Sequence, residues 1–168
     1  MSVINVEIKA KCKEANKIEA LLMAKNARYI GEDHQVDTYF NVANGRLKLR
    51  EGSIENNLIH YKRSNQEGPK KSVVALYGSA PNSTLKEVLT RANGVKVVVD
   101  KRRKIFFIKN VKFHLDIVKN LGSFVEIEAI DKDGSINEEQ LQEQCDFYMA
   151  YLGIESTDLI AVSYSDLL

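Results

Sequence analysis

The chain has 168 residues, of which 44% are hydrophobic and 28% are charged, and its formal net charge is only +1. This length favours a single domain, over residues 1–168, with a sizeable core. A protein that coats nucleic acid through its phosphates would carry a large positive excess. The near balance of charges therefore argues against a nucleic-acid partner.

The sequence contains no apolar run of about 18 residues and no charged-then-apolar leader at its start. The two cysteines, Cys12 and Cys145, match no metal or redox spacing and are expected to be buried thiols in a reducing compartment. We therefore predict a cytoplasmic protein without a membrane-spanning helix, a signal peptide or a membrane partner.

Short apolar segments between polar turns make up the first half of the chain. A strand over 3–11 precedes an amphipathic helix over 14–27, which places Ile18, Leu21 and Leu22 on one face. Asn44-Gly45 is a strong hairpin signal. Regular short strands with hairpin turns predict an antiparallel meander, with further strands over 28–30, 35–42, 46–50, 58–63 and 71–76.

The second half begins with a helix over 83–93, where Thr84 and Glu87 have capping-box spacing and Gly94 follows the last turn. A final helix is expected over 137–152, and the apolar tail to residue 168 should dock on the body. Strands are expected between these helices over 95–101, 104–108, 111–117 and 124–130. The prediction is an α+β fold, an eight-stranded antiparallel β-barrel (tunnel) with flanking α-helices.

The segment Phe124–Ala129 alternates strictly between two kinds of side chain. A strand with this pattern places Val125 and Ile127 on one face and Glu126 and Glu128 on the other. Two like charges on one face weaken a sheet unless cations or a metal lie opposite them. The strand therefore requires a charged partner.

Several other predicted strands also carry charge at every second residue. A charged face in an ordinary sheet meets water, and for any one strand that interpretation is as good as a functional one. Helices can cover only the outer side of the barrel wall, however. The charged side chains that alternate along five or six strands are therefore expected to point into the barrel and meet there. The side chains predicted to point inward are Lys9, Lys11, Lys48, Arg50, Lys62, Lys101 and Arg103 as cations, and Glu7, Asp116, Glu126 and Glu128 as anions.

Charged side chains inside a barrel imply water and a charged ligand, because each buried unpaired charge costs several kcal/mol. Arginine forks and lysine point charges suit a polyanion such as a phosphate chain. Carboxylates suit the hard cations Mg2+ or Mn2+. No glycine-rich phosphate loop is present, so the prediction is a metal-phosphate site outside the usual nucleotide-binding architectures.

Several short segments together resemble, in order and spacing, the CYTH superfamily of triphosphate tunnel metalloenzymes. These segments are 5–9, 47–50, 61–62, 101–103, 114–116 and 124–128. Segments 35–40, 68–70 and 121–124 look most like the class IV adenylyl cyclase branch. The resemblance implies an eight-stranded antiparallel tunnel in which basic residues hold a triphosphate and glutamates hold a divalent metal.

Position by position, the resemblance implies metal-binding roles for Glu7, Glu126 and Glu128, with Asp116 as a helper. The implied phosphate ligands are Lys9, Lys48, Arg50, Lys62, Lys101 and Arg103. Two positions depart from the family pattern. Asn5 replaces the first glutamate of the Glu-x-Glu-x-Lys signature, and Lys48 replaces a more usual arginine.

By this resemblance the chain is a metal-dependent enzyme acting on a small-molecule triphosphate, most like an adenylyl cyclase that converts ATP to cyclic AMP and pyrophosphate. Two alternatives stay open. One is a triphosphatase acting on tripolyphosphate, thiamine triphosphate or a nucleoside triphosphate, and the other is a non-catalytic polyphosphate-binding module. No general base is assigned, since a structural role is favoured for His114 over a catalytic one. A dimer is compatible with the sequence.

Overall fold

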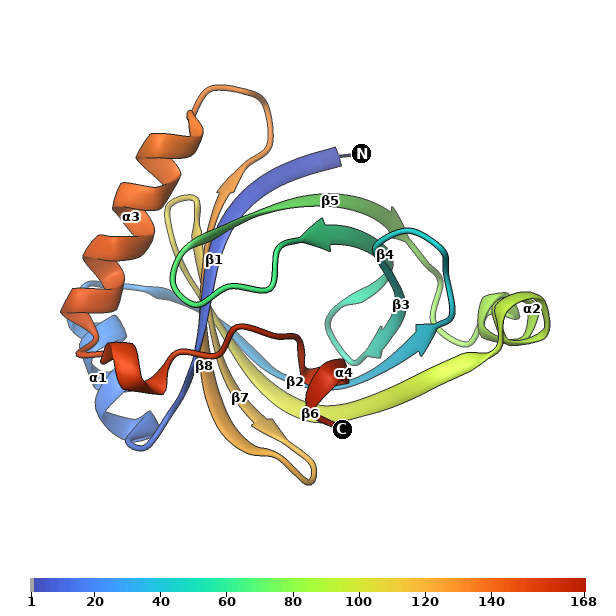
Figure 1. Cartoon of the computed structure of the whole chain (residues 1–168). Helices are drawn as coiled ribbons and strands as arrows, with labels where there is room; N and C mark the ends of the chain where they lie inside the picture. The colour runs from blue at the N-terminus through green and yellow to red at the C-terminus, as the bar shows by residue number, and fades with distance from the viewer. Residues whose placement is uncertain (1) are drawn as a thin grey trace.

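A computed structural model describes residues 2–168 and shows a closed barrel with strand order β1-β5-β4-β3-β2-β6-β7-β8 (Figure 1). The strands are β1 Ser2–Lys11, β2 Arg28–Phe40, β3 Arg46–Gly52, β4 Asn56–Arg63, β5 Lys70–Gly78, β6 Val95–Ile108, β7 Val111–Val118 and β8 Gly122–Asp131. The helices are α1 Ala15–Ala24, α2 Leu85–Asn93, α3 Glu138–Tyr151 and α4 Tyr164–Leu167, with a 3-10 turn at Ser156–Asp158. All pairings are antiparallel, so the predicted α+β barrel with flanking helices is confirmed.

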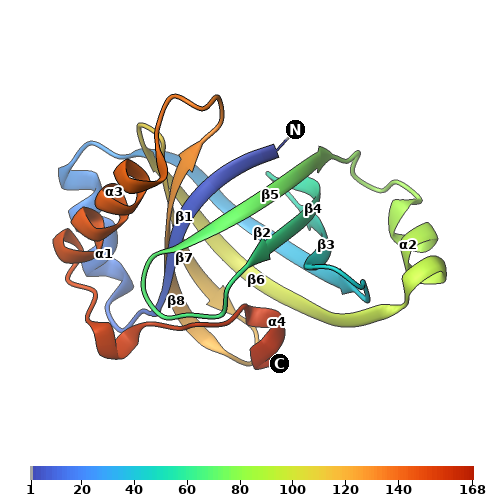
Figure 2. The ribbon, with the colours of Figure 1, turned by 45° about the horizontal axis from the view of Figure 1, so that its top comes forward.

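The main apolar core lies outside the barrel wall, between the strands and two helices. Helices α1 and α3 cover one side of the barrel, whereas α2 stands at the opposite side (Figures 1 and 2). The outward residues of β1, β7 and β8 are buried with residues of these helices: Val6, Ile8, Ala10, Phe113, Leu115, Val125, Ile127, Ala129, Ile18, Leu22, Leu141 and Cys145. Since alternate strand residues point outward into this core, their neighbours must face the barrel interior.

Two predicted strand breaks are wrong. The segment 28–30 and residues 35–40 of the segment 35–42 belong to one strand, β2, which pairs with β6 along its whole length apart from register shifts. Gly31, at φ 146°, lies at one of these shifts. The segments 95–101 and 104–108 likewise form the single strand β6. The polar residues taken for a turn continue β2 because Asp33 and Gln35 are buried and hydrogen-bonded inside the barrel.

The hairpin predicted at Asn44-Gly45 is confirmed, since β2 and β3 pair around it and Gly45 has φ 64°. The predicted docking of the C-terminal tail is also confirmed. Leu159 bridges Ala10, and the ammonium of Lys70 donates to the carbonyl of Ala161 at 2.7 Å. None of the helices between residues 2 and 168 has both the length and the apolar character that a membrane crossing requires.

Candidate functional site: a charged cavity in the barrel

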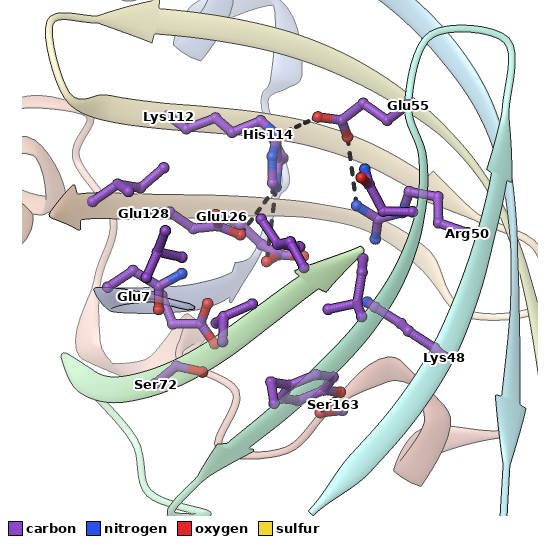
Figure 3. A pocket seen from close by; sticks show the side chains of 18 of the residues that line it. Glu7, Lys48, Arg50, Glu55, Ser72, Lys112, His114, Glu126, Glu128 and Ser163 are labelled. Atoms are coloured by element: carbon purple, nitrogen blue, oxygen red, sulfur yellow. Dashed lines mark hydrogen bonds and ion pairs between the residues drawn. The ribbon is translucent and has the colours of Figure 1, made fainter. Parts of the chain in front are cut away.

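The barrel encloses a cavity of about 300 Å3 whose wall is rich in charged side chains (Figure 3). Four carboxylates line it: Glu7, Glu55, Glu126 and Glu128. The cations that line it are Lys9, Lys48, Arg50, Arg63, Lys101, Arg103, Lys112 and Lys132. Cations outnumber carboxylates at this wall, and an anionic ligand is therefore favoured.

Three of these cations are held by one carboxylate behind the cavity wall. Asp37 is fully buried and accepts hydrogen bonds from Arg50 at 2.9 and 2.8 Å and from Lys101 at 2.7 Å, and Lys48 lies 3.2 Å away. Burial alone would raise the pKa of Asp37, but the cations hold it well below its usual value. Asp37 therefore stays ionised and fixes the three cations at the wall.

A second buried carboxylate holds Arg103. Asp116 accepts both guanidinium bonds of Arg103 at 2.7 Å, and it also accepts the hydroxyl of Tyr164 at 2.8 Å. Arg103 in turn reaches Glu126 at 3.1 Å. The two oxygens of Asp116 are thus already occupied within the protein. This geometry favours a role in positioning Arg103 over the predicted role of metal helper.

Across the cavity from Lys48 and Arg50 lies a group formed by His114, Glu126 and Glu128, from the paired strands β7 and β8 (Figure 3). One ligand atom of each residue lies within 4.8 Å of the others. Burial and the nearby Arg103 lower the pKa of His114, so its ring is neutral at pH 7. Burial opposes the charge of Glu126, but Lys9 and Arg103 hold its pKa well below the usual value.

Glu7 lines the same cavity but is engaged elsewhere. Its carboxylate accepts from Arg63, whose other guanidinium nitrogen donates to Ser163 in the C-terminal tail at 2.7 Å. Asn5, at the position where the family signature has a glutamate, also faces the cavity, and its buried amide oxygen has no hydrogen-bond partner among residues 2–168.

Comparison with known proteins places this charged barrel in a family. The signature of the CYTH domain matches residues 3–164. The chain belongs to the CYTH family. It is 24% identical over 173 residues to a Methanocaldococcus jannaschii protein named "Putative adenylate cyclase MJ0240", and the match covers 98% of both chains.

Solved structures share the fold of this CYTH domain. PH1012 from Pyrococcus horikoshii OT3 superposes with a TM-score of 0.84 at 22% identity, covering 98% of this chain and 99% of that one. A Hippeastrum protein described as "Putative adenylyl cyclase HpAC1", with "a dominant" triphosphatase activity, superposes with a TM-score of 0.60 at 13% identity, covering 95% and 91%. At these identities the likeness concerns the fold alone.

Two of the cations predicted to point inward in the CYTH tunnel lie outside the cavity. Lys62 is exposed because Tyr61 and Arg63, on either side of it, are the residues of β4 that line the interior. Lys11 has the same parity as Lys9 but lies at the last residue of β1, where it is exposed. The inward orientation predicted for Lys62 is therefore wrong, and Arg63 lies where Lys62 was expected. Lys11 does not line the cavity, because β1 ends there.

Apart from Asp116, the other predicted residues line the cavity, but the sequence interpretation missed four charged ones: Arg63, Lys112, Lys132 and Glu55. Lys112 lies two residues before His114 on β7 and therefore on the same face of the strand, so the alternation of the sequence was enough to predict that it points inward. Glu55 lies in the turn between β3 and β4, where no periodicity applies, and its carboxylate accepts from Lys112 and from Gln35.

A buried aspartate fixes the turn that carries Glu55. Asp33 accepts the hydroxyl of Ser53 and the backbone amides of Ile54 and Glu55, each at 2.9 Å. These bonds lower the pKa of Asp33 although burial opposes the shift. The turn is thereby held with Glu55 directed at the cations Lys112 and Arg50 (Figure 3).

One side of the cavity is apolar. Ile59 of β4 and Val74 and Leu76 of β5 line it, close to the rings of Tyr39 and Tyr61. The two hydroxyls lie 3.4 Å apart, and that of Tyr61 also reaches Ser163 at 2.9 Å. The CYTH cavity therefore combines a charged wall for an anion with a neutral wall for an apolar or aromatic group.

Proposed function

We propose that this CYTH domain is a divalent-metal-dependent adenylyl cyclase, which converts ATP to cyclic AMP and pyrophosphate inside the barrel. The observation that carries the proposal is the division of the cavity wall. Lys48 and Arg50 of β3, fixed by Asp37, line one side of the cavity, and a carboxylate pair, Glu126 and Glu128 of β8, lines the far side of the closed barrel. Few ligands other than a metal-bound phosphate chain match both sides at once.

The cations would bind and orient the phosphates. Arg50 and Arg103 each use two guanidinium nitrogens on a buried carboxylate, so their direction is set before substrate arrives. Lys48, on the same strand as Arg50, and Lys101, on the same strand as Arg103, add point charges. Preorganised cations of this kind stabilise developing negative charge without a reorganisation cost at the moment of reaction.

Glu126 and Glu128 fit a divalent metal, because both line the cavity and Glu126 stays ionised. The metal, when bound, would offset charge on the reacting phosphate and on the leaving pyrophosphate. Lys9 would assist from β1, since it lies opposite Glu126 in the strand register and its ammonium sits 3.7 Å from the centre of the Tyr164 ring. Its place at the wall is therefore fixed by an aromatic ring as well as by charge.

The apolar wall supports a nucleoside triphosphate over inorganic tripolyphosphate. Ile59, Val74 and Leu76 offer no partner to a phosphate, but they suit the faces of a base. An all-phosphate substrate would leave this part of the cavity without a matching group. A ribose hydroxyl is present only in a nucleotide, and it is the nucleophile that a cyclase requires.

Triphosphate hydrolysis is the second candidate. A triphosphatase needs the same phosphate and metal groups, with water as nucleophile in place of the ribose hydroxyl. The Hippeastrum protein, which has the same fold and is described as having a dominant triphosphatase activity, supports this second candidate. The two activities differ in product, so one assay separates them.

The test is to incubate the purified protein with ATP, thiamine triphosphate or tripolyphosphate, each with Mg2+ and with Mn2+, and to identify the products. We expect cyclic AMP and pyrophosphate from ATP, and a loss of about a hundredfold or more in rate for Glu126→Gln. Glu87→Gln, on the exposed helix α2, is the matched control and should keep the wild-type rate.

Orthophosphate in place of cyclic AMP would replace the cyclase assignment with a triphosphatase. Binding alone would be seen as stabilisation, about 2.7 kcal/mol at a ligand concentration a hundredfold above Kd. If triphosphates stabilise the protein and no product forms with either metal, the chain is a binding module. If they neither bind nor react, the proposal is refuted.

A further inference from the structure

His114 is a buried histidine that the phosphate chemistry leaves without a role. It lies on β7 with its side chain 1% exposed, and neither ring nitrogen has a hydrogen-bond partner among residues 2–168. Buried polar atoms are nearly always paired, so two unpaired nitrogens on one ring require an explanation. A purely structural histidine would have found a partner within the protein.

We propose that His114 is itself a ligand of the divalent metal, so that the metal site consists of one imidazole nitrogen and the carboxylates of Glu126 and Glu128. This inference rests on the proposed metal-dependent function and specifies which residues hold the ion. It also predicts which class of metal the site selects.

The distances support a shared ion. The Nδ1 atom of His114 lies 3.8 Å from an oxygen of Glu126 and 3.7 Å from an oxygen of Glu128. These separations are too long for hydrogen bonds. Two atoms bound to one ion at about 2.1 Å each lie between about 3 and 4.2 Å apart, and both measured distances fall in that range.

The strand register explains why the three residues meet. His114 is directly opposite Glu126 in the β7–β8 pairing, and Glu128 is the next inward residue along β8. All three therefore project from adjacent positions of one rigid wall (Figure 3). Glu7 does not take part, because Arg63 holds its carboxylate. Asn5, where the family signature has a glutamate, brings no carboxylate, so His114 completes a set of three.

A nitrogen ligand changes the metal preference. Mg2+ favours an all-oxygen set, whereas first-row transition metals accept imidazole and bind more tightly along the series from Mn2+ to Co2+. We therefore expect the site to prefer Mn2+ and Co2+ over Mg2+. The preference should be lost when the nitrogen donor is replaced by an amide oxygen.

The test is electron spin echo spectroscopy of the full chain loaded with one equivalent of Mn2+, together with titration calorimetry for Mn2+, Co2+ and Mg2+ without triphosphate. We expect a 14N modulation from a directly bound imidazole, and a changed modulation when the protein is grown with 15N-histidine. His114→Gln should abolish the 14N modulation, lower Mn2+ affinity by about tenfold or more, and leave Mg2+ affinity within about threefold.

The other two histidines supply the control. His34 is exposed and His60 is half-buried, and neither lines the cavity, so a His34→Gln, His60→Gln double variant should keep the wild-type modulation and affinities. Bound Mn2+ without a 14N modulation in the wild type would overturn the assignment, as would a modulation that persists in His114→Gln. The isotope experiment uses the wild type alone, so it decides the matter even if His114→Gln does not fold.

Failure of this inference is distinguishable from failure of the proposed function. Mn2+ bound through oxygen alone, with cyclic AMP still formed from ATP, would remove His114 from the site and leave the enzyme assignment intact. If no divalent metal binds with or without ATP, both are refuted.

Discussion

The two sides of the barrel wall differ in what covers their outer face. On one side, helices α1 and α3 lie over β1, β7 and β8 and bury their outward residues. On the other side, around β4 and β5, the described helices leave the outer face open to solvent (Figure 2). Val73 and Tyr77 of β5 are accordingly 49% and 65% exposed.

This difference explains the division of the cavity. A strand needs an apolar face somewhere, and the helix-covered strands bury theirs outward. Their inner faces are then free to carry charge, such as Lys9, His114 and Glu126. The open strands β4 and β5 instead place Ile59 and Val74 inside. The helix cover therefore accounts for the charged inner face of β1, β7 and β8, whereas Lys48 and Arg50 of β3 are held at the wall by Asp37.

The largest expected effect comes from truncating one side chain on each side of the barrel and comparing the losses of stability. Phe113 is fully buried under α3, with its ring 5.0 Å from that of Tyr148. Phe113→Ala should lower the free energy of unfolding by about 3–5 kcal/mol, because it leaves a cavity in the main core. Val73→Ala, on the open side, should change it by less than about 0.5 kcal/mol.

Chemical denaturation of both variants measures these values directly. A cost above about 2 kcal/mol for Val73→Ala would mean that the outer face of β5 is covered in solution. The division into a covered and an open side would then be wrong for the protein as it exists in solution.

The alternation of β8 was enough to predict the barrel interior. Val125 and Ile127 face the helices while Glu126 and Glu128 face the cavity, as their order in the sequence requires. The same rule holds on β1 for Glu7 and Lys9. Where one face is clearly apolar, period two fixes the direction of every side chain.

The rule failed where neither face is clearly apolar. On β4, Tyr61 and Arg63 face inward and Lys62 faces outward. The local sequence does not reveal which face is the inner one, because each face carries a cation. Residues 31–34 resemble a turn because they are polar, but Asp33 is buried through long-range hydrogen bonds to residues 53–55. Such contacts are properties of the closed barrel and are not encoded locally.

A smaller effect is expected from Lys70, on the open side of the barrel. Its ammonium donates to the carbonyls of Gln66 and Ala161, and burial with nearby Arg63 and Lys9 lowers the pKa of Lys70 to about 8. Between pH 8 and 10.5 the unfolded chain therefore binds more protons at this residue than the folded protein, so stability rises with pH.

The gain attributable to Lys70 should be about 2 kcal/mol between about pH 8 and about pH 9.5, and should be absent in Lys70→Met. Urea denaturation of both proteins at several pH values measures it as a difference, which cancels the other titrating groups. Equal pH dependence in the two proteins would show that the Lys70 ammonium keeps an ordinary pKa. The lysine that holds the tail carbonyl of Ala161 would then stay charged up to about pH 10.

The smallest effect distinguishes the helix that covers the barrel from the one that does not. Asn137 caps α3, accepting from the amide of Gln140 at 2.8 Å while the Gln140 side chain accepts from the amide of Asn137 at 3.1 Å. Asn137→Ala should lower the free energy of unfolding by about 1 kcal/mol, because α3 unfolds with the core.

Thr84, predicted to cap α2, makes no cap bond to any described residue, and α2 fully buries none of its side chains. Thr84→Ala should therefore change the free energy of unfolding, measured by chemical denaturation, by less than about 0.5 kcal/mol. Equal losses for both variants would mean that α2 unfolds together with the barrel, so its exposure could no longer be taken as independence from the core.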